Sequence, residues 1–136
     1  MNDIEYMEKA IEQAKKAYKK EEVPIGAIIV KDNKIISTGY NKKEKDNVAI
    51  RHAEIIAIEK ACKKLKSWRL DGCILYTTLE PCNMCMGAIQ ESRISKVVYG
   101  CPKATNYFPG NNLEIVGNVK KNECLSLLQS FFENKR

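Results

Sequence analysis

Apolar residues recur along this chain at two alternating periods, one typical of helices and the other of strands. Near the start they fall every three or four residues, which predicts an amphipathic helix from Ile4 to about Lys20. Apolar segments at 27–30 and 35–40 flank the turn pair Asp32-Asn33, so they predict a β-hairpin. The later segments continue the alternation: a helix from about 52 to 65, a strand at 74–78, a short helix at 82–91, strands at 96–99 and 113–116, and a closing amphipathic helix that contains Phe131 and Phe132.

Strands that alternate with helices in this way predict a three-layer α/β domain with five strands. The chain has 136 residues, enough to bury a core and a usual length for one domain, so we expect residues 1–136 to form a single domain. No apolar stretch approaches the roughly 18 residues of a membrane span, and the acidic start lacks the features of a signal peptide. These observations favour a cytoplasmic protein with no membrane association.

Charge and cysteine content narrow the function only slightly. The net charge of +6, from 23 basic and 17 acidic residues, permits a polyanionic partner without requiring one. Lysine clusters such as 42–45 have an ordinary interpretation as solvated surface. The six cysteines are expected to be reduced, bound to metal or buried, because disulfides are rare in cytosolic proteins.

Candidate chemistry is concentrated in two short segments. His52-Ala53-Glu54 offers an imidazole and a carboxylate, and Pro81-Cys82-Asn83-Met84-Cys85 offers two thiolates spaced Cys-x-x-Cys. One His and two Cys leave a tetrahedral Zn²⁺ one open position, which is typical of catalytic zinc sites. Zinc lowers the pKa of a water molecule at such a position to about 7, and Glu54 is placed to carry protons. The sequence therefore predicts one Zn²⁺ per chain, held by His52, Cys82 and Cys85, with Glu54 as the catalytic acid–base.

Both segments are expected to lie at helix starts. Helix N-termini carry unpaired N–H groups and a partial positive charge, which stabilise thiolates such as those of Cys82 and Cys85. If each helix follows a strand, all three ligands lie at the carboxyl ends of neighbouring strands. Open α/β sheets bind their ligands at that edge.

Each motif also has an ordinary structural interpretation. A lone Cys-x-x-Cys is more often a redox pair or half of a structural zinc site, and the single histidine could be a satisfied core residue. A redox pair leaves His52 and Glu54 unexplained. A structural four-cysteine site would need a second Cys-x-x-Cys, which the chain lacks. A catalytic zinc site accounts for all four residues.

The H-x-E and P-C-x-x-C motifs resemble the signature of the zinc nucleobase deaminases, which belong to the cytidine-deaminase-like superfamily. Within it, the chain is similar to the bacterial-type tRNA adenosine deaminases, which convert the wobble adenosine of an anticodon to inosine. The resemblance covers about residues 5–100 and 122–136, and it implies a three-layer α/β/α fold with a five-stranded mixed sheet. The matching stretches are 22–27, 39–41, 52–55, 78–89, 92–94, 123–124 and 131–132.

This resemblance implies a zinc-dependent hydrolytic deaminase that binds a tRNA anticodon stem-loop. It implies that Asn41 hydrogen-bonds the target nucleotide and that the Ala53 backbone helps to hold the base. Gly-Tyr-Asn is also a good strand-ending turn in any protein, so Asn41 has a structural interpretation as well. The family's C-terminal helix contributes to the RNA surface, which would use Phe132, Lys135 and Arg136, whereas we expect Phe131 in the core. A homodimer is implied too, with residues 82–93 as a possible interface.

Two departures from the family pattern leave alternatives open. Arg51, just before the histidine, is similar to the catalytic subunit of the eukaryotic two-subunit tRNA deaminases, and the 101–112 connection is shorter than in the family. That connection contacts the tRNA loop in relatives. A free-base or nucleoside deaminase acting on guanine or cytosine is therefore the alternative enzyme, since 58–62 and 71–77 look as much like guanine deaminases. A non-catalytic RNA-binding subunit typically lacks the glutamate that this chain has at Glu54.

Overall fold

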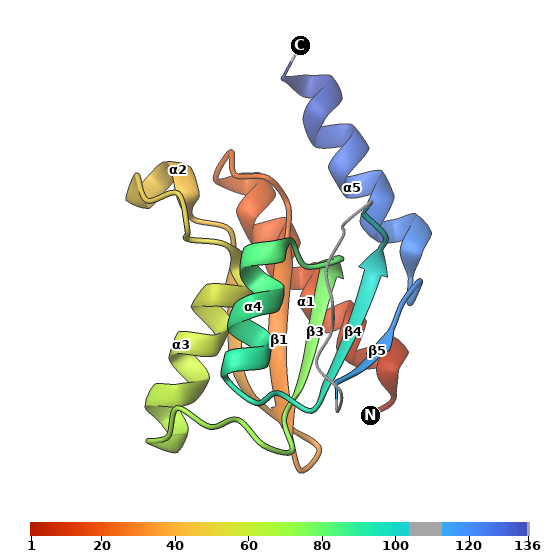
Figure 1. Ribbon diagram of the computed structural model, residues 1–136. Helices are drawn as coiled ribbons and strands as arrows, with labels where there is room; N and C mark the ends of the chain where they lie inside the picture. Colours follow the sequence, from red (N-terminus) through yellow and green to blue (C-terminus); the bar gives the residue numbers. More distant parts are fainter. Residues whose placement is uncertain (104–112, 136) are drawn as a thin grey trace.

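A five-stranded mixed sheet forms the centre of the molecule, in a computed structural model that describes residues 1–103 and 113–135 (Figure 1). The strand order is β2-β1-β3-β4-β5. β1 is antiparallel to both β2 and β3, whereas β3, β4 and β5 run parallel to one another. The strands are β1 (Gly26–Lys31), β2 (Lys34–Tyr40), β3 (Ile74–Leu79), β4 (Lys96–Cys101) and β5 (Glu114–Val116).

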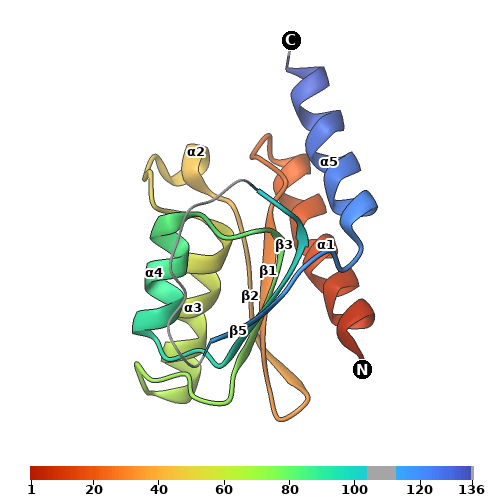
Figure 2. The same ribbon diagram turned by 45° about the vertical axis from the view of Figure 1, so that its right-hand side comes forward.

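Helices cover both faces of this sheet, which confirms the expected three-layer α/β/α architecture. Figure 2 shows α3 (Ala53–Leu65) and α4 (Asn83–Glu91) on one face, and α1 (Asp3–Lys19) and α5 (Lys121–Asn134) on the other. Successive residues of the central strands point to opposite faces. Leu75 and Val97 therefore pack under α3 and α4, and Tyr76 and Val98 pack under α1 and α5. None of the helices in the described ranges is long and apolar enough to cross a membrane.

Two glycines bring the covering helices into direct contact with the sheet. A Cβ atom at Gly26 would lie 2.1 Å from the Ala10 carbonyl oxygen of α1, and one at Gly39 would lie 2.5 Å from the Ala53 carbonyl oxygen of α3. Only glycine allows so close an approach of backbone to backbone. Gly39 thereby seats the start of α3 against the end of β2.

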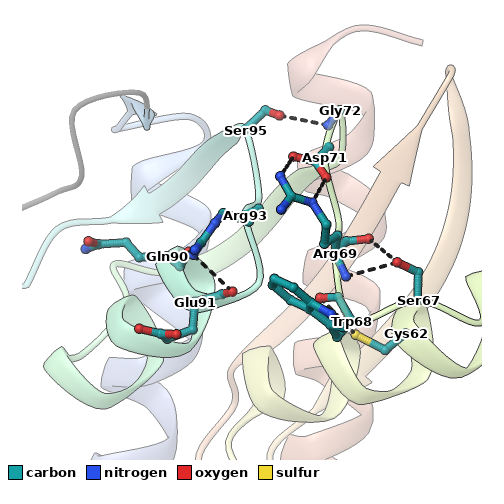
Figure 3. Close-up of polar contacts among 10 residues, drawn as sticks. All are labelled: Cys62, Ser67, Trp68, Arg69, Asp71, Gly72, Gln90, Glu91, Arg93 and Ser95. Atoms are coloured by element: carbon teal, nitrogen blue, oxygen red, sulfur yellow. Dashed lines mark hydrogen bonds and ion pairs between the residues drawn. The ribbon is translucent and has the colours of Figure 1, made fainter.

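At the edge of the sheet where β3 and β4 begin, the loop that precedes β3 contacts the loop that precedes β4 (Figure 3). The backbone N–H of Gly72 donates to Ser95 Oγ at 2.8 Å. Trp68 is 60% exposed, and the guanidinium groups of Arg69 and Arg93 lie 5.4 and 5.8 Å from its ring centre. These contacts hold the ends of α3 and α4 side by side, away from the edge at which β3 ends.

Candidate active site

The two sequence motifs meet at the edge of the sheet where β2 and β3 end. His52 is the N-cap residue of α3, and Cys82 is the N-cap residue of α4, as the pattern of helix starts predicts. β2 and β3 point the same way because each is antiparallel to β1. The expectation that the ligands follow neighbouring strands was wrong, because β1 pairs with both strands and lies between them.

His52, Cys82 and Cys85 form the cluster that the sequence predicts, called here the zinc cluster. Nδ1 of His52 lies 3.7 Å from Sγ of Cys82 and 3.5 Å from Sγ of Cys85. The ligand atoms of all three residues lie within 4.8 Å of one another. Ordinary Zn–N and Zn–S bond lengths at a tetrahedral angle place the nitrogen and sulfur about 3.6 Å apart. The observed spacing therefore fits a tetrahedral Zn²⁺ with Nδ1 as the histidine ligand atom.

The surroundings of the zinc cluster favour a bound cation. Burial lowers the pKa of His52, and the positive charges of Lys103 and Lys43 lower it further, which favours the neutral imidazole that metals require. Cys85 is fully buried, and burial raises its pKa, as do the neighbouring Glu54 and Cys82. The Cys85 thiol and the Glu54 carboxyl group are both buried, so they become favourable as anions only beside a compensating positive charge. A divalent metal supplies that charge and deprotonates the thiols that coordinate it.

Glu54 lies in the first turn of α3, directly beside the zinc cluster. Its side chain is buried, and its carboxyl group hydrogen-bonds the Cys85 thiol. Burial raises the pKa of Glu54 to about 7. A carboxyl group with a pKa near neutrality can both accept and donate a proton at physiological pH, as an acid–base catalyst must.

Asn41 contacts the same helix start from the end of β2. Its side chain is 7% exposed, and Oδ1 accepts a hydrogen bond of 2.9 Å from the backbone N–H of Ala53. His52 makes no side-chain capping hydrogen bond, so Asn41 caps α3 from a distance of twelve residues. The N–H of Ala53 is thus already engaged. Asn41 fixes the turn that carries His52 and Glu54, a structural role that motif reading did not reveal.

Lysines border the approach to this site. Lys43 and Lys103 are close enough to His52 to influence its pKa, and Lys103 is tied down by its backbone N–H, which donates to Glu80 Oε1 at 2.7 Å. A hollow of about 620 Å³ lies between the C-terminal ends of α1 and α5 and the short helix α2 (Lys43–Asp46). Its lining includes Lys20, Glu22, Lys45, Phe132 and Lys135.

The C-terminal residues lie as expected where the structure describes them. Phe131 is buried at 7% exposure and Phe132 is 52% exposed, which confirms Phe131 as a core residue. Residues 104–112, which make up most of the connection expected to be short, and Arg136 lie outside the described residues.

The lysine cluster at 42–45 is visible in the sequence, but the sequence does not show that Lys43 lies near His52.

Known proteins share both the motifs and the fold. Residues 1–101 match the family model described as the cytidine and deoxycytidylate deaminase zinc-binding region. The chain is 44% identical over 143 aligned positions to a tRNA-specific adenosine deaminase of Bacillus subtilis (strain 168), covering 96% of this chain and 89% of the relative.

Two of the similar solved structures represent the two substrate classes considered from the sequence. One comes from studies of A-to-I editing by tRNA:A34 deaminases at the wobble position of transfer RNA; it is 32% identical with a TM-score of 0.83, covering 91% of this chain and 99% of that chain. The other is a guanine deaminase from Bacillus subtilis, 42% identical with a TM-score of 0.72, covering 75% of this chain and 66% of that chain. With the family signature, the near-complete alignment and the His52–Cys82–Cys85 cluster in agreement, the chain belongs to the zinc-dependent cytidine and deoxycytidylate deaminase family and, within it, to the tRNA-specific adenosine deaminases.

Proposed function

We propose that this protein hydrolyses the wobble adenosine of a tRNA anticodon to inosine. The observation that carries the proposal is the zinc cluster beside the buried carboxyl group of Glu54, with Lys43 and Lys103 at its approach. The cluster and the carboxyl group suit hydrolysis of an aromatic amidine. The lysines suit a substrate that carries phosphates.

The reaction exchanges the C6–N bond of adenosine for a C6–O bond and releases ammonia. Zinc, when bound, supplies a water molecule of lowered pKa. Glu54 moves the two protons of that water in turn, the first to the ring nitrogen N1 and the second to the departing amine. Its pKa of about 7 suits both the uptake and the delivery of each proton. The α3 start held by Asn41 keeps the carboxyl group in place through both transfers.

Asn41 and Ala53 are proposed to bind the target nucleotide. Because Oδ1 of Asn41 is committed to the Ala53 N–H, the contact from Asn41 would use its amide NH₂ group as a donor. A purine ring nitrogen or a ribose oxygen can accept such a bond. The Ala53 contact would then come from its backbone on the same helix turn.

The charge near the site favours a nucleic-acid substrate over a free base. A neutral base such as guanine offers nothing to the lysines near His52, whereas the phosphates that flank an anticodon nucleotide do. The guanine enzyme remains the alternative to test, because its identity of 42% is high over the part that aligns.

The test is conversion of adenosine to inosine at the wobble position of an anticodon stem-loop, beside ammonia release from guanine, cytosine and cytidine. We expect inosine from the wild type, a loss of at least about 100-fold in Glu54→Ala, and wild-type activity in the matched control Glu12→Ala. Glu12 is exposed on α1, and among the described residues it forms an ion pair with Lys9 alone. Zinc content should be equal in all three proteins. Ammonia from guanine with a silent RNA reaction would refute the tRNA assignment.

We propose further that the protein is a cytoplasmic homodimer, as the family resemblance implies. The expected interface around 82–93 includes Met84, 38% exposed on α4, and lies beside the exposed ring of Trp68, which contacts Arg93 (Figure 3). All six cysteines are free thiols, which suits a reducing compartment. Light scattering should give twice the chain mass for the wild type and a lower mass for Trp68→Ala. A wild-type monomer would contradict the dimer.

A further inference from the structure

The segment from Lys42 to Arg51 joins Asn41 to His52, so both of its ends lie at the active site. Its helix α2 is four residues long, and every residue from Lys43 to Ile50 is exposed. Within the described residues, α2 packs against no other helix or strand, and its N-cap residue makes no side-chain capping bond. A single helical turn is not stable by itself in water. A contact from outside must therefore hold it.

Glu22, in the connection between α1 and β1, makes that contact. One carboxylate oxygen accepts a hydrogen bond of 3.0 Å from the backbone N–H of Glu44, and the other accepts one of 2.7 Å from the N–H of Lys45. Glu22 is only 2% exposed. A buried carboxylate is tolerated where its oxygens are hydrogen-bonded, and such charge-assisted bonds are the strong ones. Two bonds to adjacent N–H groups fix the orientation of the turn as well as its position.

Arg51 holds the other side of the segment. Its guanidinium group lies 3.1 Å from Asp46 Oδ2 and 2.9 Å from Glu59 Oε1 on α3, and its carbonyl oxygen accepts a bond from the Lys42 N–H. Among the described residues, the side chains that hydrogen-bond residues 43–50 are those of Glu22 and Arg51. The two ends of the segment are therefore joined by the Lys42–Arg51 backbone hydrogen bond. Arg51 links the segment to α3, and Glu22 holds the helical turn α2.

The turn that Glu22 holds in place carries two lysines, Lys43 and Lys45, which alternate with the acidic residues Glu44 and Asp46. Lys43 is near His52, and Lys45 shares the lining of the 620 Å³ hollow with Lys20 and Lys135. Glu22 lies in the same lining. A displaced α2 would move Lys43 away from His52 and Lys45 out of the lining of the hollow.

The geometry points to Glu22 as a positioning residue, which clamps the 42–51 segment so that Lys43 and Lys45 meet the phosphates beside the target nucleotide. This inference rests on the proposed function, since it assumes an RNA substrate. Glu22 acts through the segment and needs no contact with the zinc cluster or the reacting atoms. Its loss should therefore weaken RNA binding without slowing the chemical step.

The variant Glu22→Gln tests the clamp, with Glu44→Gln as its matched control. Both variants remove one negative charge from the same region, but the Glu44 side chain makes no hydrogen bond or ion pair among the described residues. For Glu22→Gln we expect the KM for the stem-loop to rise about fivefold or more, with kcat and zinc content unchanged. Trypsin should cleave within 42–51 about tenfold faster, because a protease cuts backbone that unfolds locally and the loss of the Glu22 bonds favours local unfolding of this segment. Glu44→Gln should resemble the wild type or bind RNA more tightly.

Equal KM values and equal trypsin rates in the two variants would overturn the inference. Amide hydrogen exchange of the wild type gives a check that needs no variant: the N–H groups of Glu44 and Lys45 should exchange slowly although both residues are exposed. Fast exchange at both would also overturn it. A wild type inactive on RNA would refute the proposed function and the RNA part of this inference, while the trypsin and exchange results would still decide whether Glu22 clamps the segment.

Discussion

Replacing Asn41 by Ala and by Asp separates its structural contact from the substrate contact proposed for it. Alanine removes both the Oδ1 atom that accepts the Ala53 N–H and the amide NH₂ group. Aspartate keeps an acceptor oxygen at nearly the same place but has no NH₂ group. The two variants should therefore differ in stability and agree in lost activity.

The structure sets the size of the expected effects. Asn41 is 7% exposed and Ala53 is fully buried, so Asn41→Ala leaves a buried N–H without a partner. Such a loss costs about 1–3 kcal/mol, within the range seen on removing a helix cap. We expect Asn41→Ala to lower the free energy of unfolding by about 2 kcal/mol. Asn41→Asp should stay within about 1 kcal/mol of wild type, because its charge faces the positive end of α3.

Urea unfolding with zinc in excess measures the first effect, and single-turnover deamination of the stem-loop measures the second. We expect both variants to lose about 10-fold or more in activity, since one hydrogen bond to substrate is gone. An Asn41→Ala protein as stable as the wild type would refute the energetic argument. An Asn41→Asp protein with full activity would refute the proposed NH₂ contact and leave Asn41 with its capping role alone.

Three further predictions concern stability, metal and the C-terminal helix. Gly26→Ala should destabilise the fold by about 3 kcal/mol in urea unfolding, because the new Cβ would lie 2.1 Å from a backbone oxygen, whereas Gly87→Ala, with nothing within 4 Å, should be neutral or stabilising. A chelator should lower the melting temperature and added zinc should restore it, and metal analysis well below one zinc per chain would contradict this. Phe131→Ala should cost about 3 kcal/mol, since Phe131 is buried, while Phe132→Ala should leave stability within about 0.5 kcal/mol and weaken RNA binding in a filter assay. Equal stability losses in the two phenylalanine variants would refute that assignment.

The local sequence was sufficient for the elements and the metal ligands. Apolar periodicity depends on residues within a few positions of one another, so every helix and strand except the polar α2 could be predicted with nearly the bounds that the structure shows. Zinc affinity depends on residue type, which is why His52, Cys82 and Cys85 could be named before their positions were known. The placement of Phe131 inside and Phe132 outside follows from the same helical period.

Long-range packing decided the rest. β1 lies between β2 and β3 because strand order depends on pairing across the sheet, which no local pattern encodes. From the sequence, Glu22 is expected to be an ordinary surface glutamate. In the folded chain it is buried, and it accepts hydrogen bonds from the backbone N–H groups of Glu44 and Lys45, more than twenty residues away. Asn41 likewise gains its capping role only because β2 ends beside the start of α3. The sequence alone determined which side chains could bind zinc and move protons. The tertiary structure decided which other side chains, such as Asn41 and Glu22, position the active-site residues and the segment beside them. A hydrogen bond between residues distant in the sequence forms only after the chain has packed.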